Sequence, residues 1–169
     1  AKLYYPDNRI QHAGVVVGIR GAAGHGHKRF DREDPGYKAR PHLNQNVSAV
    51  TAALLMVKRD LFDAVGGLEE DRVRIAFNDS DFCLRLRERG LLNVFTPYCE
   101  AWHHESLSRG YEDTEEKKER FWREVEYFRE RHEAVLQSGD PYYNPNLTLN
   151  HENFDLDDAV KASTETVTG

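Results

Sequence analysis

Short runs of β-branched and aromatic residues alternate with turn-forming and polar stretches through the first hundred residues. The apolar runs at 3–5 and 10–19 are separated by Pro6-Asp7-Asn8, which favours a hairpin because proline fixes φ and the Asx side chain supports a turn. Residues 47–59 form a continuous apolar run, and residues 93–103 form another. Both runs predict strands, the first of them buried.

Two short helices are predicted between these strands. The stretch 59–68 has Asp60 as its expected cap and Gly66 at its expected left-handed end, and the stretch 79–89 follows Asn78 and stops before Gly90. Strand, helix, strand, helix and strand in this order predict an α/β layer, a mixed sheet with flanking helices. The glycine-, proline- and charge-rich segment 20–41 has no apolar period and predicts a long loop, either a lid or a substrate loop.

The C-terminal third begins with the clearest helix, an amphipathic segment over 111–137 with apolar residues at spacings of three and four. Asp113 and Glu116 fit a variant of the capping box. We therefore divide the chain into a body at 1–110, this helix, an aromatic extension at 138–158 and a disordered tail at 159–169.

Composition and charge narrow the class of protein. The 169 residues include 39% apolar and 31% charged residues, which fits one globular domain with its own core. The net charge of -6 gives no basic footprint for nucleic acid or anionic lipid. Cys83 and Cys99 lack C-x-x-C spacing, so neither a zinc cage nor a disulfide framework is expected. No run of about 18 apolar residues predicts a membrane segment, and we expect a cytoplasmic protein, free or at the inner face of the membrane.

Asp79 and Asp81 are the first candidates for chemistry. They stand in the first turn of a predicted helix, where carboxylates are common because the macrodipole stabilises negative charge by about 0.3–1 kcal/mol. The alternative is a functional site, since the strand that returns after this helix ends in His103, and open α/β sheets bind ligands beyond the carboxyl ends of their strands. His25 and His27 form an H-x-H pair that is either solvated or metal-ligating, whereas His12 is most simply a core histidine.

Several segments taken together resemble a known family. "YYPDNRIQHAGVVVG", "VTAALLMVKRDLFDAVGGLEE", "FNDSDFCLRLRERG", "NVFTPYCEAWHHESLSRG" and "DPYYNPNLTL" occur in this order over residues 1–150. They resemble family-2 glycosyltransferases with the GT-A fold, especially bacterial enzymes of O-antigen and related polysaccharide assembly. The resemblance implies inverting transfer of a sugar from a nucleotide-sugar donor to the hydroxyl of a saccharide or lipid-linked acceptor.

The resemblance also implies roles for single residues. Asp79 matches the general base that takes the proton of the acceptor hydroxyl, and His103 matches a ligand of the divalent metal, Mn²⁺ or Mg²⁺, that neutralises the departing diphosphate. The expected acceptor-binding residues are Asp81, Thr51 and Trp102, with Asp81 alternatively supporting helix geometry. The weaker diphosphate candidates are His104, Arg109, Arg20 and Lys28.

Two residues depart from the family pattern. Asn78 stands where the family often has Glu or Asp. A carboxylate at this position would raise the pKa of Asp79 and make it a better base, and the neutral Asn78 does not have this effect. Ala52 follows Thr51 where the family usually has glycine, which places a methyl group where the backbone approaches substrate.

The resemblance further implies a nucleotide-binding half with its own D-x-D motif, which would precede residue 1. The opening "AKLYYPDNRI" has no initiator Met, so we expect an excised acceptor-side half of a GT-A fold, inactive alone, whose exposed apolar sheet surface would favour a homo-oligomer. Two other classes stay open. One is a non-catalytic carbohydrate-binding or assembly module. The other is a phosphotransferase or metal hydrolase that uses Asp79, Asp81 and His103 directly.

Overall fold

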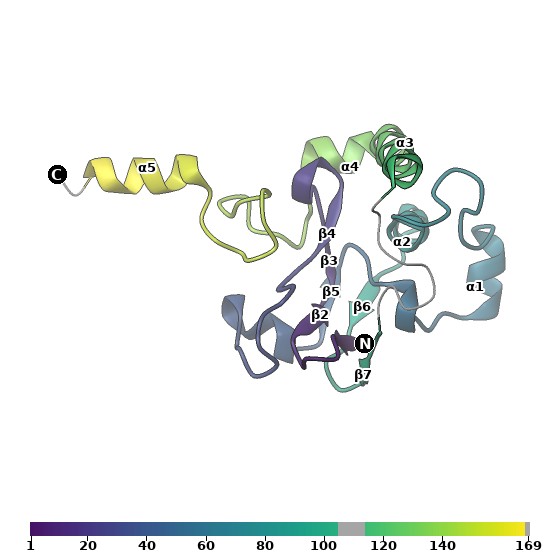
Figure 1. The fold of residues 1–169 in the computed structure, drawn as a ribbon, viewed down its shortest axis with the longest axis horizontal. Coiled ribbons are helices and arrows are strands. Elements are labelled where there is room, and N and C mark those ends of the chain that lie inside the picture. The colour runs from purple at the N-terminus through teal and green to yellow at the C-terminus, as the bar shows by residue number, and fades with distance from the viewer. Residues whose placement is uncertain (105–113, 168–169) are drawn as a thin grey trace.

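The computed structural model describes residues 1–104 and 114–167, with side chains to residue 163, as a mixed α/β structure (Figure 1). The strands are β1 (Lys2–Tyr4), β2 (Ile10–His12), β3 (Val15–Val17), β4 (Ala23–His25), β5 (Gln45–Val47), β6 (Asn93–Phe95) and β7 (Glu100–Trp102). The α-helices are α1 (Arg59–Ala64), α2 (Asn78–Glu88), α3 (Glu115–Arg131), α4 (Glu133–Ser138) and α5 (Asp158–Val167). β1 pairs antiparallel with β2 and parallel with β7, so the expected mixed sheet with helices is confirmed.

The N-terminal hairpin forms as predicted, but the second apolar run is broken. Gly14 adopts a φ of 96° between β2 and β3, and a Cβ there would lie 2.9 Å from the Cγ1 atom of Val47. A side chain is therefore disfavoured at this bend both by conformation and by space. The composition of the segment 20–41 predicted a long loop. The structure instead forms β4 within it, and β4 pairs antiparallel with β3.

The apolar run at 47–59 is not one buried strand. β5 pairs antiparallel with β6 only over Gln45–Val47, burial continues to Val50, and a short 3-10 helix follows at Ala52–Leu54. Met56 is 99% exposed. The prediction fails here because an apolar strand needs a paired neighbour, and in the described part of the chain this run has none beyond the bridge from Ala49 to Val15. The run at 93–103 is likewise divided, into β6 and β7, which belong to different sheets.

The two central helices form at the predicted places, with different N-caps. Lys58 precedes α1 without a side-chain cap, and Asp60 lies inside the first turn, where its carboxylate accepts from the N–H of Leu61. Phe77, with a φ of 63°, precedes α2, so Asn78 is not the cap either. The helix ends are as expected, since Gly66 and Gly90 both have positive φ.

The long C-terminal helix is interrupted. Thr114 caps α3 by accepting from the N–H of Lys117, whereas Asp113 lies outside the residues that the structure describes. The helix ends at Arg131, and α4 begins beyond His132, so the predicted continuous segment to residue 137 becomes two helices. The tail expected to be disordered instead contains α5, which extends away from the body (Figure 1).

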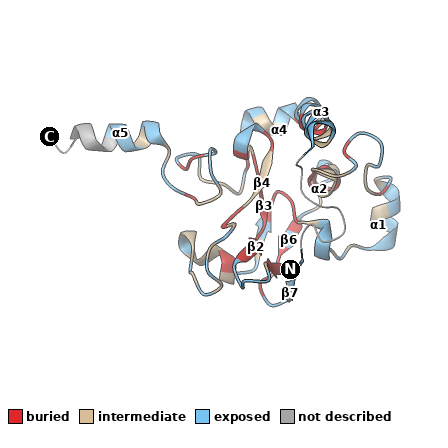
Figure 2. Ribbon diagram, viewed as in Figure 1, coloured by how far each residue is buried: buried red, intermediate tan, exposed pale blue. Residues whose placement is uncertain are grey.

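The core lies between the sheets and α2 (Figure 2). Phe82, Cys83 and Leu86 of α2 pack with Tyr4 and Phe95, and a second cluster joins α3 to this body through Phe128. The aromatic extension packs against β3 through a third cluster formed by Val16, Ile19, Leu147 and Phe154. No helix in the described part of the chain has the length and apolarity required to cross a membrane.

Candidate functional site

A cavity of about 1020 Å³ lies at the N-terminus of α2, between the β3–β4 hairpin and α3. It brings together residues that are far apart in the sequence. Those of the predicted site residues that line it are Asp79, Thr51, His103, His104, Arg20 and Lys28. The strands of the body, the segment 20–41 and the helices α2 and α3 all contribute residues to this cavity. We therefore take it as the candidate functional site.

Asp79 occupies the first turn of α2 and is half-buried at the cavity. Its Oδ1 accepts from the N–H of Ser80 at 2.7 Å, and its Oδ2 accepts from the N–H of Ala52 at 3.1 Å. Oδ1 also accepts from the Ser80 hydroxyl at 3.4 Å. These hydrogen bonds fix the plane of the carboxylate. Asn78 does not take part, because its side-chain amide donates to the carbonyl of Arg74.

Thr51 and Ala52 lie beside this carboxylate. The Thr51 hydroxyl accepts from the N–H of Ala53 and caps the short 3-10 helix, so the turn that presents the Ala52 N–H to Asp79 is itself held. Ala52 lines the cavity and is exposed, so its methyl group takes up space at this site.

Glu124 of α3 fixes the segment that leads into α2. Its buried carboxylate, 3% exposed, accepts from the N–H of Ala76 at 2.6 Å and from the N–H of Ile75 at 3.3 Å. This contact positions Asp79 indirectly, because Ile75 and Ala76 lie four and three residues before it in the chain. The sequence does not distinguish Glu124 from the other glutamates of its helix, and its role depends entirely on what α3 packs against.

His103 follows β7 and has one ring nitrogen engaged. The Gln11 side chain donates from Nε2 to the carbonyl of His103 at 3.2 Å, and its Oε1 lies 2.8 Å from Nδ1 of the His103 ring. Since an amide oxygen only accepts, Nδ1 carries the hydrogen of the neutral ring, and Nε2 has the lone pair. A histidine metal ligand is typically oriented in this way.

A complete metal site is not formed by the described residues. Within 1–104 and 114–167, no group of three or more histidine, cysteine, aspartate or glutamate side chains is arranged to hold an ion. The assignment of His103 as a ligand of Mn²⁺ or Mg²⁺ therefore stays a prediction.

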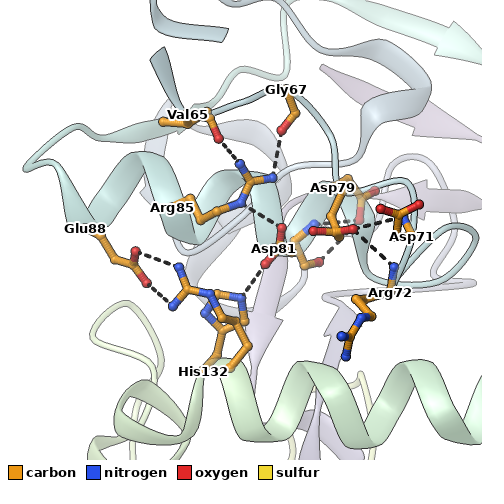
Figure 3. A network of polar contacts seen from close by, with 12 residues as sticks. Val65, Gly67, Asp71, Arg72, Asp79, Asp81, Arg85, Glu88 and His132 are labelled. Carbon is orange, nitrogen blue, oxygen red and sulfur yellow. Dashed lines mark hydrogen bonds and ion pairs between the residues drawn. The ribbon is translucent and has the colours of Figure 1, made fainter. Parts of the chain in front are cut away.

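Asp81 does not reach the cavity, although we expected it to contact an acceptor. It is 2% exposed, with His132 Nε2 at 2.9 Å from Oδ1 and Arg85 Nε at 2.8 Å from Oδ2 (Figure 3). Arg85 also donates to the carbonyls of Val65 and Gly67. Burial would raise the pKa of Asp81, but the hydrogen bonds from His132 and Arg85 outweigh it, and the pKa is lowered. Asp81 thus joins α2 to the α3–α4 junction and to the turn after α1.

The remaining predicted residues lie elsewhere. Trp102 is 48% exposed, donates from Nε1 to Oδ1 of Asn8 at 2.7 Å and does not line the cavity, and Arg109 lies outside the described residues. Instead, Trp122 of α3 lines the cavity with 58% of its surface exposed. In the sequence Trp122 is only one apolar position of an amphipathic helix, and helical spacing alone does not show which apolar residue faces a cavity.

No protein-family model matches the chain, and no solved structure matches it. "Uncharacterized protein y4gI" of Sinorhizobium fredii (strain NBRC 101917 / NGR234) is 56% identical over 156 residues, which cover 92% of this chain and 17% of that protein. "O-antigen biosynthesis protein RfbC" of Myxococcus xanthus is 37% identical over 150 residues, which cover 88% of this chain and 11% of that protein. The chain thus spans only a small part of the length of these curated relatives.

Proposed function

We propose that this chain is the acceptor side of an inverting, family-2 glycosyltransferase with the GT-A fold, which acts in the synthesis of a cell-surface polysaccharide. The observation that carries the proposal is the half-buried carboxylate of Asp79, held by two backbone N–H groups at the edge of a cavity with cationic and imidazole side chains. A general base needs this combination of fixed orientation and access to substrate.

In the proposed reaction, the acceptor hydroxyl lies against Asp79. Its oxygen attacks the anomeric carbon of the donor sugar, its proton passes to the carboxylate, and the bond from the anomeric carbon to the diphosphate oxygen breaks. The departing group leaves with both electrons of that bond and is therefore more negative than before. Arg20, Lys28 and His104 line the same cavity and supply the polar and cationic groups that would stabilise it.

The divalent metal enters this proposal only through His103. Its Nε2 would contribute one ligand, and an ion bound there would offset the charge of the departing diphosphate. The other ligands would come from the diphosphate and from protein groups other than the residues described, in keeping with the much greater length of the relatives. The steps assigned to Asp79 do not depend on this ligand set.

The relatives support the polysaccharide part of the proposal. The Myxococcus protein has O-antigen biosynthesis in its name, and its similarity extends over 88% of this chain. We propose that the donor-binding half is supplied by another part of a longer protein, as both relatives are several times longer than this chain.

The test is Asp79→Asn in the full-length protein that contains this chain. We expect transfer to fall by about 10²–10⁴-fold, the usual contribution of a general base, with binding of a panel of nucleotide-sugars nearly unchanged. The host's surface polysaccharide, separated by gel electrophoresis, reports transfer, and calorimetry reports donor binding. Equal loss of both would refute the role of Asp79 as base. An unchanged polysaccharide would favour the non-catalytic carbohydrate-binding module.

A further inference from the structure

A row of aromatic rings leads along one side of the cavity toward Asp79. Trp122 of α3 packs edge to face on Phe121, with ring centroids 5.7 Å apart and an interplanar angle of 70°. Phe121 lies in turn against Phe77, with ring centroids 5.9 Å apart. Phe77 directly precedes α2 and stands two residues before Asp79, and these residues all line the cavity. Ring contacts therefore connect Trp122 to the segment that carries the proposed base.

The three rings differ in how they are packed. Phe77 and Phe121 are half-buried, and both pack on the core cluster that contains Val125 and Phe128. Trp122 is not part of this cluster, and 58% of its surface is exposed. A large ring that is supported from behind and exposed on a cavity wall is typical of a surface that binds a ligand.

Glu124 holds Trp122 and Asp79 in one frame. It stands two residues after Trp122 on α3, and its buried carboxylate accepts from the N–H groups of Ile75 and Ala76. The helix that carries Trp122 is thus bound to the segment that leads to Asp79. A site that is preformed in this way loses less conformational entropy when a ligand binds.

The β3–β4 segment supplies a polar side to the same cavity. Arg20 and Lys28 line the cavity, and Arg20 forms an ion pair of 3.1 Å with Glu152, which lines it as well. A pyranose ring has the same division, because it carries C–H bonds on its faces and hydroxyl groups around its edge. A lipid chain is apolar on all sides and would desolvate these charges without hydrogen-bonding them. The cavity therefore matches a saccharide better than a lipid.

We propose that Trp122 is a stacking platform for a sugar ring of the acceptor. The inference rests on the proposed function, which places the acceptor hydroxyl at Asp79. It also names the class of acceptor: a pyranoside with one face free of axial oxygen atoms, because an axial oxygen would hold the ring away from the indole. Trp122 takes the role that the sequence assigned to Trp102, which does not line the cavity.

The two tryptophans of the chain make the contact directly observable. Trp102→Phe leaves only Trp122, and Trp122→Phe leaves only Trp102, which is the matched control because it is 48% exposed outside the cavity. Each variant of the 169-residue chain is titrated with methyl β-D-galactopyranoside, which has one face free of axial oxygen atoms. We expect a saturable shift of the emission to shorter wavelength in Trp102→Phe, because the sugar displaces water from the indole, and none in Trp122→Phe.

Affinity measured by NMR titration tests the stacking itself. We expect Trp122→Ala to weaken binding of the galactoside about tenfold, the usual effect of losing one aromatic contact, whereas Trp122→Tyr should keep most of the affinity. Methyl α-D-mannopyranoside has an axial oxygen on each face and should bind more weakly than the galactoside. Equal affinities for the two glycosides would contradict stacking, as would equal affinities of Trp122→Ala and the unmodified chain.

Three fluorescence results would also overturn the inference. They are the absence of a saturable shift in Trp102→Phe, an equal shift in both single-tryptophan variants, and a shift of Trp122 with uridine or geranyl diphosphate but not with the galactoside. The last result would assign the platform to a nucleobase or to a lipid. None of these measurements needs sugar transfer. If Asp79→Asn abolishes transfer and Trp122 does not respond, only this inference fails, and the proposed function stands.

Discussion

Asp81 offers the sharpest test of how this fold is held together, because one buried carboxylate joins three parts of the chain. Its two oxygens contact His132 at the α3–α4 junction and Arg85, which in turn donates to the carbonyls of Val65 and Gly67 (Figure 3). The side chains of Asp81 and His132 are each 2% exposed, and that of Arg85 is 15% exposed. Solvent therefore cannot replace the carboxylate if it is removed.

Asp81→Asn keeps the shape of the side chain and removes its charge. The amide oxygen can accept from one partner, but the amide nitrogen then faces the other, so at least one charge-assisted hydrogen bond is lost. We expect a loss of about 1.5–3 kcal/mol in the free energy of unfolding. Asp81→Ala removes both acceptors and leaves Arg85 without its counter-charge, for which we expect about 3–5 kcal/mol. The total stability of a domain of this size is about 5–15 kcal/mol.

Urea denaturation followed by circular dichroism measures these differences. At the usual slope for small proteins, a loss of 2 kcal/mol lowers the midpoint by about 1 M. Asp63→Asn is the matched control, because Asp63 pairs with Arg59 four residues away, as Asp81 does with Arg85, but their side chains are 55% and 86% exposed. We expect the control to change stability by less than about 1 kcal/mol. Equal losses in the two Asn variants would refute the argument from burial.

The lowered pKa of Asp81 predicts a pH dependence of stability. The stabilisation by the ionised carboxylate is fully present above the unfolded-state pKa of about 3.9 and is lost as pH falls through the folded-state pKa. The difference in unfolding free energy between the wild type and Asp81→Asn should therefore become smaller between pH 7 and pH 3, and a constant difference would contradict this. Gly14→Ala should cost about 1–3 kcal/mol in urea denaturation, because of the positive φ and the contact with Val47, and a neutral substitution would refute the strain. Cys99 is exposed, whereas burial raises the pKa of Cys83 to about 12. A thiol reagent at pH 8 should therefore react with Cys99 alone in the native chain and with both thiols in urea. Rapid reaction of Cys83 in the native chain would contradict its burial.

Local structure was predictable wherever neighbouring residues decide it. Glycine at positions 66 and 90 ends two helices because a left-handed residue is needed there, and apolar residues three and four apart define the long helix before α4. The apolar run at 47–59 did not become a strand along its whole length. Apolar residues continue beyond residue 50, but the ladder of β5 with β6 covers only Gln45–Val47.

The sequence by itself determined that the chain is an α/β domain with two aspartates in the first turn of its central helix. It did not determine which of the two aspartates is accessible to a substrate, because that depends on how α2 is oriented about its own axis when it packs on the rest of the fold. Asp79 faces a cavity, and Asp81, two positions on, is turned inward to His132. Glu124 acquired its contacts in the same way, with the N–H groups of Ile75 and Ala76, which lie 49 and 48 residues earlier in the chain. Interactions between neighbouring residues largely determine where helices and strands form. Periodicity shows on which face of an element a residue lies, but not what that face contacts, so only packing between distant segments decides which side chains meet.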